Sequence, residues 1–488
     1  MNRLAPVPLG ALLERLSHAS VDGALDVAVE RIEVDSRAVR RGDLFVALRG
    51  EHTDGHRYIA DALNNGASGV VVEESNGVAP PPGAAIVRVP DTKRALSLLA
   101  AARYGDPSAR LHVIGVTGTN GKTTTTRMLS AILNAAGIAC GVIGTVGAEY
   151  RENHRQLRNT TPLPHELQDL LWWMALEDAK AVAMEVSSHA LALGRVDDVR
   201  FSVAVLTNVT RDHLDFHENV EAYRAAKRRL FAIAPRCVLN LDDECGALWA
   251  AELQAQGRET ITYGTAAGAT LVARDVRVDS EGTGFTLDGR RFELRLSGRF
   301  NVSNALAAIG AARFLGVSDE VCARGLAALT RVPGRMERLH GNGVDVVVDY
   351  AHTPDALENA LRALRETTAG SLIVVFGCGG DRDRGKRAEM GAVAAHLADR
   401  IVLADDNPRS EDPRTIMDDI LAGIGENDRV LPVGDRRMAI RLAIEGAKPG
   451  DVVLVAGKGH ENYQIVGERT LPFDDAAIAR EMLATVGA

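Results

Sequence analysis

The stretch VIGVTGTNGKTTTT, residues 113–126, reads as an apolar strand, a loop of Gly, Thr and Asn, and a run of hydroxyl residues that can open a helix. It nearly fits the phosphate-binding pattern G-x-x-x-x-G-K-[ST], but Val116 stands where the pattern has its first glycine. Gly118 and Gly121 still permit tight turns and a close approach of backbone N–H groups to phosphate oxygens. We therefore expect a nucleotide site that follows a buried strand.

Two residues give this loop its expected chemistry. Lys122 supplies a positive charge for the β- and γ-phosphates, and Thr123 offers a hydroxyl to Mg²⁺.

A second segment, GDRDRGK at 380–386, fits the phosphate pattern formally, but Arg387 follows it and has no hydroxyl for a metal. Its basic side chains suit the capture of a carboxylate or phosphate better than Mg-ATP; the residues are Arg382, Arg384, Lys386 and Arg387.

Composition indicates an ordinary soluble protein of about three domains. The 488 residues are 46% apolar and 25% charged, and the net charge of -9 with only 4% aromatic residues disfavours a nucleic-acid binder. Five scattered cysteines without a CxxC pair argue against a disulfide framework or a structural zinc site. With no signal peptide and no long apolar run, we expect a cytoplasmic, unanchored protein.

The alternation of apolar strands and helices predicts an α/β fold in three parts, 1–91, 92–335 and 336–488. Continuous apolar runs such as AVAMEVS and FSVAVLTNV are typical of strands buried on both faces of a parallel sheet. Residues 268–297 alternate like antiparallel hairpins, and TRVPGRMER at 330–338 reads as a hinge. The last part repeats the alternation, and each of its strands runs into a polar loop, where open α/β sheets bind ligands.

Candidate metal ligands follow two of the buried strands. Glu185 ends AVAMEVS, where a carboxylate is costly unless it is paired or metal-bound. TNVTRDHLDFH brings Asp212, His213, Asp215 and His217 to the end of another strand, and these oxygen and nitrogen ligands suit Mg²⁺ through their carboxylates. Lys227, in the helix-like run AYRAAKRRLF, reads by itself as a surface lysine.

The motifs taken together resemble the Mur ligases of bacterial cell-wall synthesis. They occur in the family's order between about residues 34 and 464: GVTGTNGKTTT, NTTP, MEVSSHAL, TNVTRDHLDFH, YRAAK, GRFNVSNALAA, RVPGRME, VDYAHTPDAL, FGCGGDRDRGKR, DNPRSEDP and AGKGHENYQ. The family's loop is GTNGKT without the extra glycine, so Val116 is ordinary in it. The resemblance implies a UDP-sugar domain, a central P-loop-type parallel-sheet ATPase domain and a C-terminal Rossmann-like α/β domain that binds an amino acid.

The resemblance also implies roles for particular residues. The nucleotide contacts would be Gly118, Thr119, Asn120, Gly121, Lys122, Thr123, Thr124, Asn301, Arg335 and Asp349, and the metal ligands Thr123, Glu185, His213 and a carbamylated Lys227. The uridine contacts would be Val34, Ser36, Glu51, His52 and Thr53, and the muramoyl-dipeptide contacts Asn159, Thr160, Thr161, Ser187 and Arg195. Leu193 stands where many relatives have Gln. The amino acid would meet Arg382, Asp406, Asn407, Pro408, Arg409, Gly457 and Glu461.

The implied reaction joins meso-diaminopimelate to UDP-N-acetylmuramoyl-L-alanyl-D-glutamate through an acyl phosphate, with ATP and two Mg²⁺ ions, in a monomeric enzyme. Lys122, Lys227, His213, Glu185 and His352 would be its catalytic residues, and either histidine could take the proton of the amine. Three alternatives stay open: a lysine-adding homologue, a folylpolyglutamate synthetase-like ligase and a non-catalytic nucleotide switch. DNPR at 406–409 favours diaminopimelate over lysine, because lysine-adding relatives lack its arginine.

Overall fold

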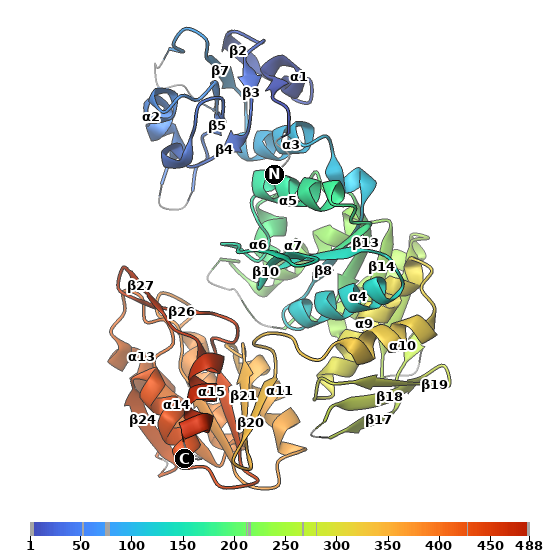
Figure 1. Ribbon diagram of the computed structural model, residues 1–488, viewed down its shortest axis with the longest axis vertical. Coiled ribbons are helices and arrows are strands. Elements are labelled where there is room, and N and C mark those ends of the chain that lie inside the picture. Colours follow the sequence, from blue (N-terminus) through green and yellow to red (C-terminus); the bar gives the residue numbers. More distant parts are fainter. Residues whose placement is uncertain are drawn as a thin grey trace. The chain divides into compact units, whose positions relative to one another are not determined.

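The computed structural model describes residues 4–50, 53–73, 79–210, 212, 216–265, 268–279, 281–426 and 428–485. The chain divides into two compact units, and Figure 1 draws their helices and strands coloured along the sequence. The first unit comprises residues 1–115, 138–204 and 226–235, and the second comprises 116–137, 205–225 and 236–488. The predicted boundaries at 91 and 335 stay predictions.

A small sheet opens the first unit. Its strand order is β2 (Ser20–Gly23), β7 (Ala85–Arg88), β6 (Gly69–Val72), β5 (Leu44–Val46) and β4 (Ile32–Glu33), parallel except for β2. Side chains alternate between two cores, so Val71 packs with α1 (Leu9–Leu13) and α3 (Thr92–Arg103), while Val70 and Val72 pack with α2 (Ile59–Asn64). Strand β1 (Val7–Pro8) pairs with β3 (Ala28–Val29).

A nine-stranded sheet carries the segment that opened the sequence analysis. Its order is β11 (Asn153–Arg155), β10 (Gly147–Tyr150), β9 (Cys140–Gly144), β12 (Ala181–Glu185), β8 (His112–Thr117), β13 (Phe201–Leu206), β14 (Arg236–Asn240), β15 (Glu259–Gly264) and β16 (Leu271–Val272). The two expected apolar runs, β12 and β13, are buried almost throughout. The helices between residues 122 and 328 are α4 (Lys122–Ala135), α5 (Pro164–Leu176), α6 (Ser188–Ala192), α7 (Val220–Ile233), α8 (Glu244–Ala255), α9 (Phe300–Phe314) and α10 (Asp319–Ala328).

The predicted antiparallel hairpins form a separate three-stranded sheet. It contains β17 (Arg274–Val278), β18 (Thr283–Leu287) and β19 (Arg290–Leu294). Asp288 and Gly289 both have positive φ angles at the turn between β18 and β19, as a tight hairpin requires. Phe285 stacks on Phe292 with their ring centroids 5.0 Å apart.

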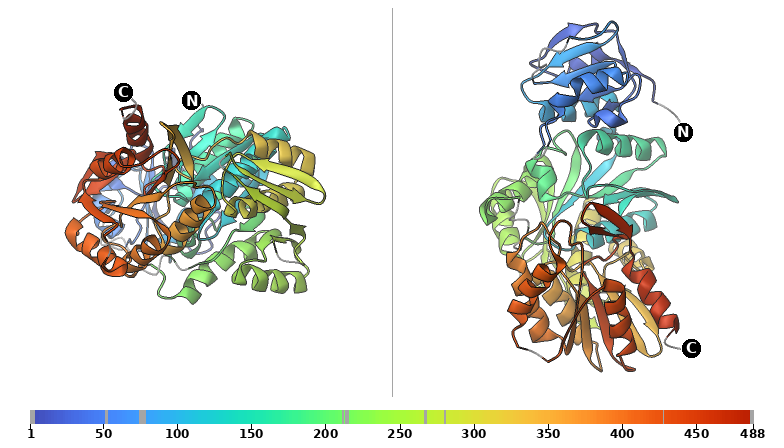
Figure 2. Two further views of the ribbon diagram at one scale, coloured as in Figure 1. Left: turned by 90° about the horizontal axis from the view of Figure 1, so that it is seen from below. Right: turned by 90° about the vertical axis from the view of Figure 1, so that its left-hand side faces the viewer.

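The last part of the second unit is a six-stranded sheet with helices on both faces (Figure 2). Its order is β20 (Glu337–Gly341), β21 (Val344–Asp349), β25 (Val452–Ala456), β22 (Leu372–Phe376), β23 (Arg400–Ala404) and β24 (Val430–Gly434), parallel except for β20. One face is covered by α11 (Pro354–Arg365), α12 (Gly385–Leu397) and α13 (Pro413–Ile424), and the other by α14 (Arg436–Glu445) and α15 (Asp475–Thr485). A hairpin of β26 (Tyr463–Val466) and β27 (Arg469–Pro472) follows β25.

The α/β fold class is therefore confirmed. Because the strands of the six-stranded sheet are mostly parallel, the loops after β21, β22, β23 and β25 leave it at one edge. These loops carry the predicted amino-acid contacts. Within the described residues, no helix has the length and apolar character needed to cross a membrane.

Candidate active site

The loop after β8 needs both of its glycines. Gly118 has a φ of 153°, and a Cβ there would lie 1.8 Å from Thr207 Oγ1. Gly121 has a φ of 83°, and a Cβ there would lie 2.3 Å from Asn304 Oδ1. Helix α4 begins directly afterwards, at Lys122. Any side chain at either glycine would therefore collide with a polar group that packs against the loop.

Hydrogen bonds from neighbouring segments fix the loop's backbone. Thr119 N donates to Asn208 O at 2.8 Å, and Asn120 N donates to Asn208 Oδ1 at 2.9 Å. Thr207 Oγ1 donates to Asn120 O at 2.6 Å, and the hydroxyls of Thr119 and Tyr223 lie 2.9 Å apart. The loop is held in place by the protein itself, as preorganised anion sites are.

Cationic groups lie at the start of α4. Lys122 Nζ donates to Gly118 O at 3.0 Å and to Thr119 O at 2.8 Å, so its ammonium lies over the loop. Arg335 Nη2 donates to Thr123 Oγ1 at 3.1 Å, and Thr123 and Thr124 are both buried. Together with the N–H groups of a helix N-terminus, these cations suit a polyphosphate.

Asp349 contributes by fixing the backbone beside Arg335. Its Oδ2 accepts a hydrogen bond from Met336 N at 2.7 Å. Burial raises the pKa of Asp349, and the nearby Arg335 opposes that rise. The guanidinium carbon of Arg335 lies 4.6 Å from the centroid of the Tyr350 ring. Asp349 thus helps to position the arginine that reaches Thr123.

Asn301 is connected to the loop through a residue that the sequence analysis missed. Its Nδ2 donates to Ser297 O at 2.9 Å, and its Oδ1 accepts from Asn304 Nδ2 at 3.1 Å. Asn304 is the side chain that faces Gly121. The spacing of three residues in GRFNVSN could have revealed the pair, because residues i and i+3 share one face of a helix.

The first unit holds Glu185 in a polar network. Glu185 is 1% exposed, its Oε1 accepts from Thr145 N at 2.9 Å, and its Oε2 accepts from Thr145 Oγ1 at 3.0 Å. A Cβ on Gly144 would lie 2.2 Å from Oε1, so glycine is required there. Sequence reasoning missed Gly144 and Thr145, although they stand in the short polar segment GTVG at the end of β9.

Four of the five predicted dipeptide contacts belong to the same network. Thr160 Oγ1 lies 3.1 Å from Thr145 Oγ1, and Thr161 Oγ1 donates to Glu185 O at 2.9 Å. Ser187 N donates to Thr161 Oγ1 at 3.0 Å, and Arg195 Nη1 donates to Thr161 O at 2.9 Å; Asn159 is exposed. Burial lowers the pKa of Arg195.

The other residues predicted for the first unit lie in different settings. Lys227, on α7, is 1% exposed, so its interpretation as a surface lysine is wrong. Ser36 is buried, and its carbonyl accepts from Asn65 Nδ2 at 2.9 Å. Val34 N donates to Glu33 Oε1 at 2.9 Å, and Thr53 is exposed. Four further predicted residues lie outside the described residues: Glu51, His52, His213 and Asp215.

Metal binding is restricted by the side chains available. In the described segments, no group of three or more His, Cys, Asp and Glu side chains converges as a metal site. Mg²⁺ prefers oxygen ligands and commonly keeps phosphate oxygens and waters in its shell. The hydroxyl of Thr123, in the second unit, and the carboxylate of Glu185, in the first, are each oxygen donors of the kind that Mg²⁺ accepts.

A charged cluster follows β23 and β25. Asn407 Oδ1 accepts from Lys458 Nζ at 2.9 Å, and Asn407 Nδ2 donates to Glu461 Oε2 at 3.0 Å. Lys458 Nζ also lies 3.3 Å from Asp406 Oδ1. Burial, and then the charge of Asp406, raises the pKa of Glu461. Gly457, with a φ of 116°, lets the backbone pass Asp406, whose Oδ2 would lie 3.1 Å from a Cβ there. The fully buried Lys458 was not predicted.

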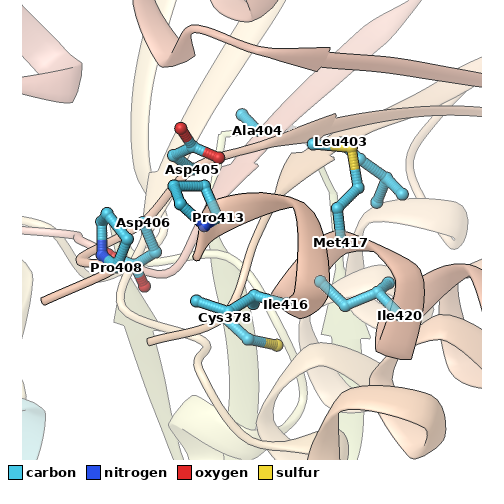
Figure 3. A pocket seen from close by; sticks show the side chains of 10 residues that line it. All are labelled: Cys378, Leu403, Ala404, Asp405, Asp406, Pro408, Pro413, Ile416, Met417 and Ile420. Carbon is cyan, nitrogen blue, oxygen red and sulfur yellow. The ribbon is translucent and has the colours of Figure 1, made fainter. Parts of the chain in front are cut away.

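Arg409 stands beside this cluster in a left-handed conformation, with a φ of 54°. Its Nη1 donates to Gly380 O at 2.7 Å, while the predicted Arg382 is exposed and donates to Asp381 O at 3.3 Å. A cavity of about 10 Å³ lies behind the turn, between β23 and α13, and Pro408 is part of its lining (Figure 3). It has room for about one water molecule, so an amino acid must bind elsewhere.

The basic loop differs from its prediction. Arg387 is fully buried and pairs with Glu411 and Asp419, and Arg384 also pairs with Glu411. Lys386 Nζ donates to His352 O at 2.9 Å. The prediction that all four basic side chains suit anion capture is therefore wrong for Arg387, whose charge is used inside the protein.

His352 lies close to the charged groups of the second unit. Its Nδ1 lies 2.8 Å from Tyr350 O, so Nδ1 carries the hydrogen and Nε2 is the basic nitrogen. Burial, and then the charge of Lys386, lowers the pKa of His352. A neutral imidazole near pH 7 can accept a proton.

Comparisons with known proteins cover most of the chain. The Mur ligase middle domain matches residues 116–312, the Mur ligase glutamate ligase domain matches 334–459, and the Mur ligase family catalytic domain matches 28–104. A UDP-N-acetylmuramoyl-L-alanyl-D-glutamate–2,6-diaminopimelate ligase from Syntrophomonas wolfei is 43% identical over 97% of this chain and 98% of its own.

Two solved structures are similar to this chain over most of its length. One bears the same ligase name, is 34% identical and has a TM-score of 0.68, covering 99% of this chain and 100% of its own. The other is a folylpolyglutamate synthase from Mycobacterium tuberculosis, complexed with ADP and AMPPCP. It is 18% identical, with a TM-score of 0.62, covering 80% of this chain and 95% of its own. That second likeness is one of fold alone.

Proposed function

This chain belongs to the Mur ligase family, and from that premise we propose that it joins meso-diaminopimelate to UDP-N-acetylmuramoyl-L-alanyl-D-glutamate in peptidoglycan precursor synthesis. The observation that carries the choice of amino acid is the charged cluster beside Arg409. Asp406 and Glu461 offer carboxylates to an ammonium group, and Arg409 offers a guanidinium to a carboxylate. The far end of diaminopimelate carries both groups, whereas that of lysine carries only an amine.

ATP is needed because a carboxylate is a poor electrophile. Its direct reaction with an amine would have to expel oxide, whereas an acyl phosphate expels phosphate. Forming that acyl phosphate brings one anion against another, so the loop's N–H groups and Lys122 offset the repulsion. Lys122 must then turn from the carbonyls of Gly118 and Thr119 toward the phosphates.

Two Mg²⁺ ions would neutralise further phosphate charge, and Thr123, Glu185, His213 and a carbamylated Lys227 would hold them. Carbamylation joins the Lys227 nitrogen to the carbon of CO₂, and the ammonium releases two protons in the process, so that a cation becomes an anion. The burial of Lys227 and the fixed position of Glu185 support these roles.

The incoming ammonium must lose a proton before its nitrogen attacks the acyl phosphate. His352, neutral and with Nε2 as its basic nitrogen, is one candidate acceptor, and His213 is the other. We also propose three domains, 1–91, 92–335 and 336–488, in a monomeric, cytoplasmic enzyme.

The experiment is a phosphate-release assay with ATP, Mg²⁺, the UDP-muramoyl-dipeptide and a panel of amino acids. Phosphate should appear only when both the dipeptide nucleotide and meso-diaminopimelate are present. Hydrolysis of ATP without an amino acid would point to a nucleotide switch, and activity with folates and glutamate would point to the folylpolyglutamate alternative.

A further inference from the structure

Two segments after neighbouring strands pack against each other backbone to backbone. We call Gly377–Arg384, after β22, the basic loop and Asn407–Glu411, after β23, the recognition turn. Gly380 N donates to Asn407 O at 2.9 Å, and Arg409 Nη1 donates back to Gly380 O at 2.7 Å. A Cβ on Gly380 would lie 1.9 Å from Pro408 O. The direction of the Arg409 guanidinium therefore depends on where the basic loop lies.

Glu411 joins the two segments with a single carboxylate. Its Oε1 accepts from Asp381 N at 2.5 Å and from Arg387 Nη2 at 2.9 Å. Its Oε2 lies 3.1 Å from Arg387 Nη1 and 3.1 Å from Arg384 Nη2. The Glu411 side chain is only 11% exposed and that of Arg387 is fully buried, so the charge-assisted contacts between these two are shielded from solvent. The hydrogen bonds of Arg387 lower the pKa of Glu411, which keeps it ionised.

A second set of hydrogen bonds closes the same junction. The Asp381 carboxylate accepts from Ser410 N at 3.1 Å and from Ser410 Oγ at 2.8 Å. Asp381 and Arg409 both have a φ of 54°, a conformation that a residue with a side chain adopts only when its surroundings impose it. The junction imposes it at both places, one in each segment.

We propose that Glu411 is a positioning residue for selection of the amino acid: it ties the basic loop to the recognition turn and so sets the separation of Arg382 and Arg409. The inference rests on the proposed function, in which Arg409 meets the distal carboxylate, and on the implied contact of Arg382 with the amino acid. Removing the charge of Glu411 takes the partner carboxylate from Arg384, leaves Arg387 with Asp419 alone, and weakens the hydrogen bond that the Asp381 N–H donates. The basic loop can then move away from the recognition turn, although Glu411 itself contributes no contact to the substrate.

The test compares Glu411→Gln with Asp419→Asn. Asp419 is the matched control, because its carboxylate also accepts a hydrogen bond from Arg387, at 2.9 Å. Asp419 lies outside both the basic loop and the recognition turn. A misplacement of about 1 Å costs roughly 100-fold in rate. We expect Glu411→Gln to raise the KM of the amino acid at least about 10-fold, with the KM values of ATP and the dipeptide nucleotide within about 2-fold. For Asp419→Asn, the KM values of the amino acid, ATP and the dipeptide nucleotide should all stay within about 2-fold of those of the unmodified enzyme.

Equal effects of the two substitutions, or an equal rise in all three KM values, would overturn the positioning role. A cycle with Arg409→Ala gives a second readout. If Glu411 acts through Arg409, the double variant should be no worse than Arg409→Ala, whereas independent effects that multiply would contradict the inference. If Glu411→Gln does not fold, Ser410→Ala loosens the same junction from its surface. It should raise only the amino-acid KM, and an unchanged KM would overturn the proposal.

The outcome can be separated from failure of the proposed function. The amino-acid panel is run first with the unmodified protein, and the variants are measured with whichever amino acid it uses. Rejection of diaminopimelate would refute the proposed function. The effect of Glu411→Gln on the KM of the accepted amino acid would still test the positioning role separately.

Discussion

Replacing Arg409 by alanine should separate recognition of the substrate from stability of the fold. Among the described residues, its side chain makes one hydrogen bond, to Gly380 O, whose loss costs about 1 kcal/mol. Alanine meets the same left-handed backbone as arginine, so no large further strain is added. A desolvated, bidentate pair with a substrate carboxylate is worth more, and its truncation costs about 2–5 kcal/mol. That corresponds to roughly 30- to 5,000-fold in kcat/KM.

The assay measures kcat/KM for meso-diaminopimelate, the KM values of ATP and the dipeptide nucleotide, and the melting temperature. Arg409→Lys is the matched control, because lysine keeps the charge but cannot form the bidentate pair. We expect both variants to lose efficiency with diaminopimelate, Arg409→Ala more strongly, while ATP and nucleotide binding stay near normal. An Arg409→Ala enzyme that uses diaminopimelate normally would refute the reasoning.

Four further predictions concern the central loop and its surroundings. Lys122→Ala should abolish ligation in the phosphate-release assay while its melting temperature stays near that of the unmodified protein; a loss as large as that of a core deletion, about 2–5 kcal/mol, would contradict its catalytic role. The Lys227→Ala enzyme should be nearly inactive, and small carboxylates should partly restore its ligase activity. Lys227→Arg should also be inactive, because a guanidinium group cannot take up CO₂. Full activity of either variant would return Lys227 to a structural role. Gly121→Ala should lower the free energy of unfolding by about 1–3 kcal/mol more than Gly137→Ala does in a thermal unfolding experiment. Both glycines have positive φ angles, but only a Cβ on Gly121 would meet a neighbouring atom, Asn304 Oδ1 at 2.3 Å. Equal losses of stability would refute this collision. Burial lowers the pKa of His352 below its ordinary 6.5, so its neutral form stabilises the fold above about pH 6.5, and that stability is lost as the pH falls through the lowered pKa. His352→Gln should therefore flatten the acid side of a plot of unfolding free energy against pH. An unchanged plot would contradict this.

The sequence revealed those parts of the site that local patterns specify. Strand β8, the two glycines with positive φ angles and the helix that begins at Lys122 all follow from VIGVTGTNGKTTTT. The polar residues after β21, β23 and β25 were predicted to share one sheet edge, because parallel strands end together.

Contacts between distant segments were beyond such patterns. Nothing near Glu185 in the sequence indicates that Thr145 holds its carboxylate across 40 positions, or that Gly144 must lack a side chain to make room. Arg387 looked like a substrate ligand because a sequence shows its charge but not Glu411, 24 positions away, which pairs with it. Lys227 looked like a surface residue because helical periodicity alone does not show which face is covered.

The choice of amino acid is tested most directly by competition in a single reaction. The unmodified protein receives ATP, Mg²⁺, the UDP-muramoyl-dipeptide and equal concentrations of meso-diaminopimelate and L-lysine, and the products are identified by mass. The account predicts that the diaminopimelate-containing tripeptide predominates and that its formation accompanies phosphate release one for one. Predominant lysine addition, or phosphate release without a tripeptide, would contradict it.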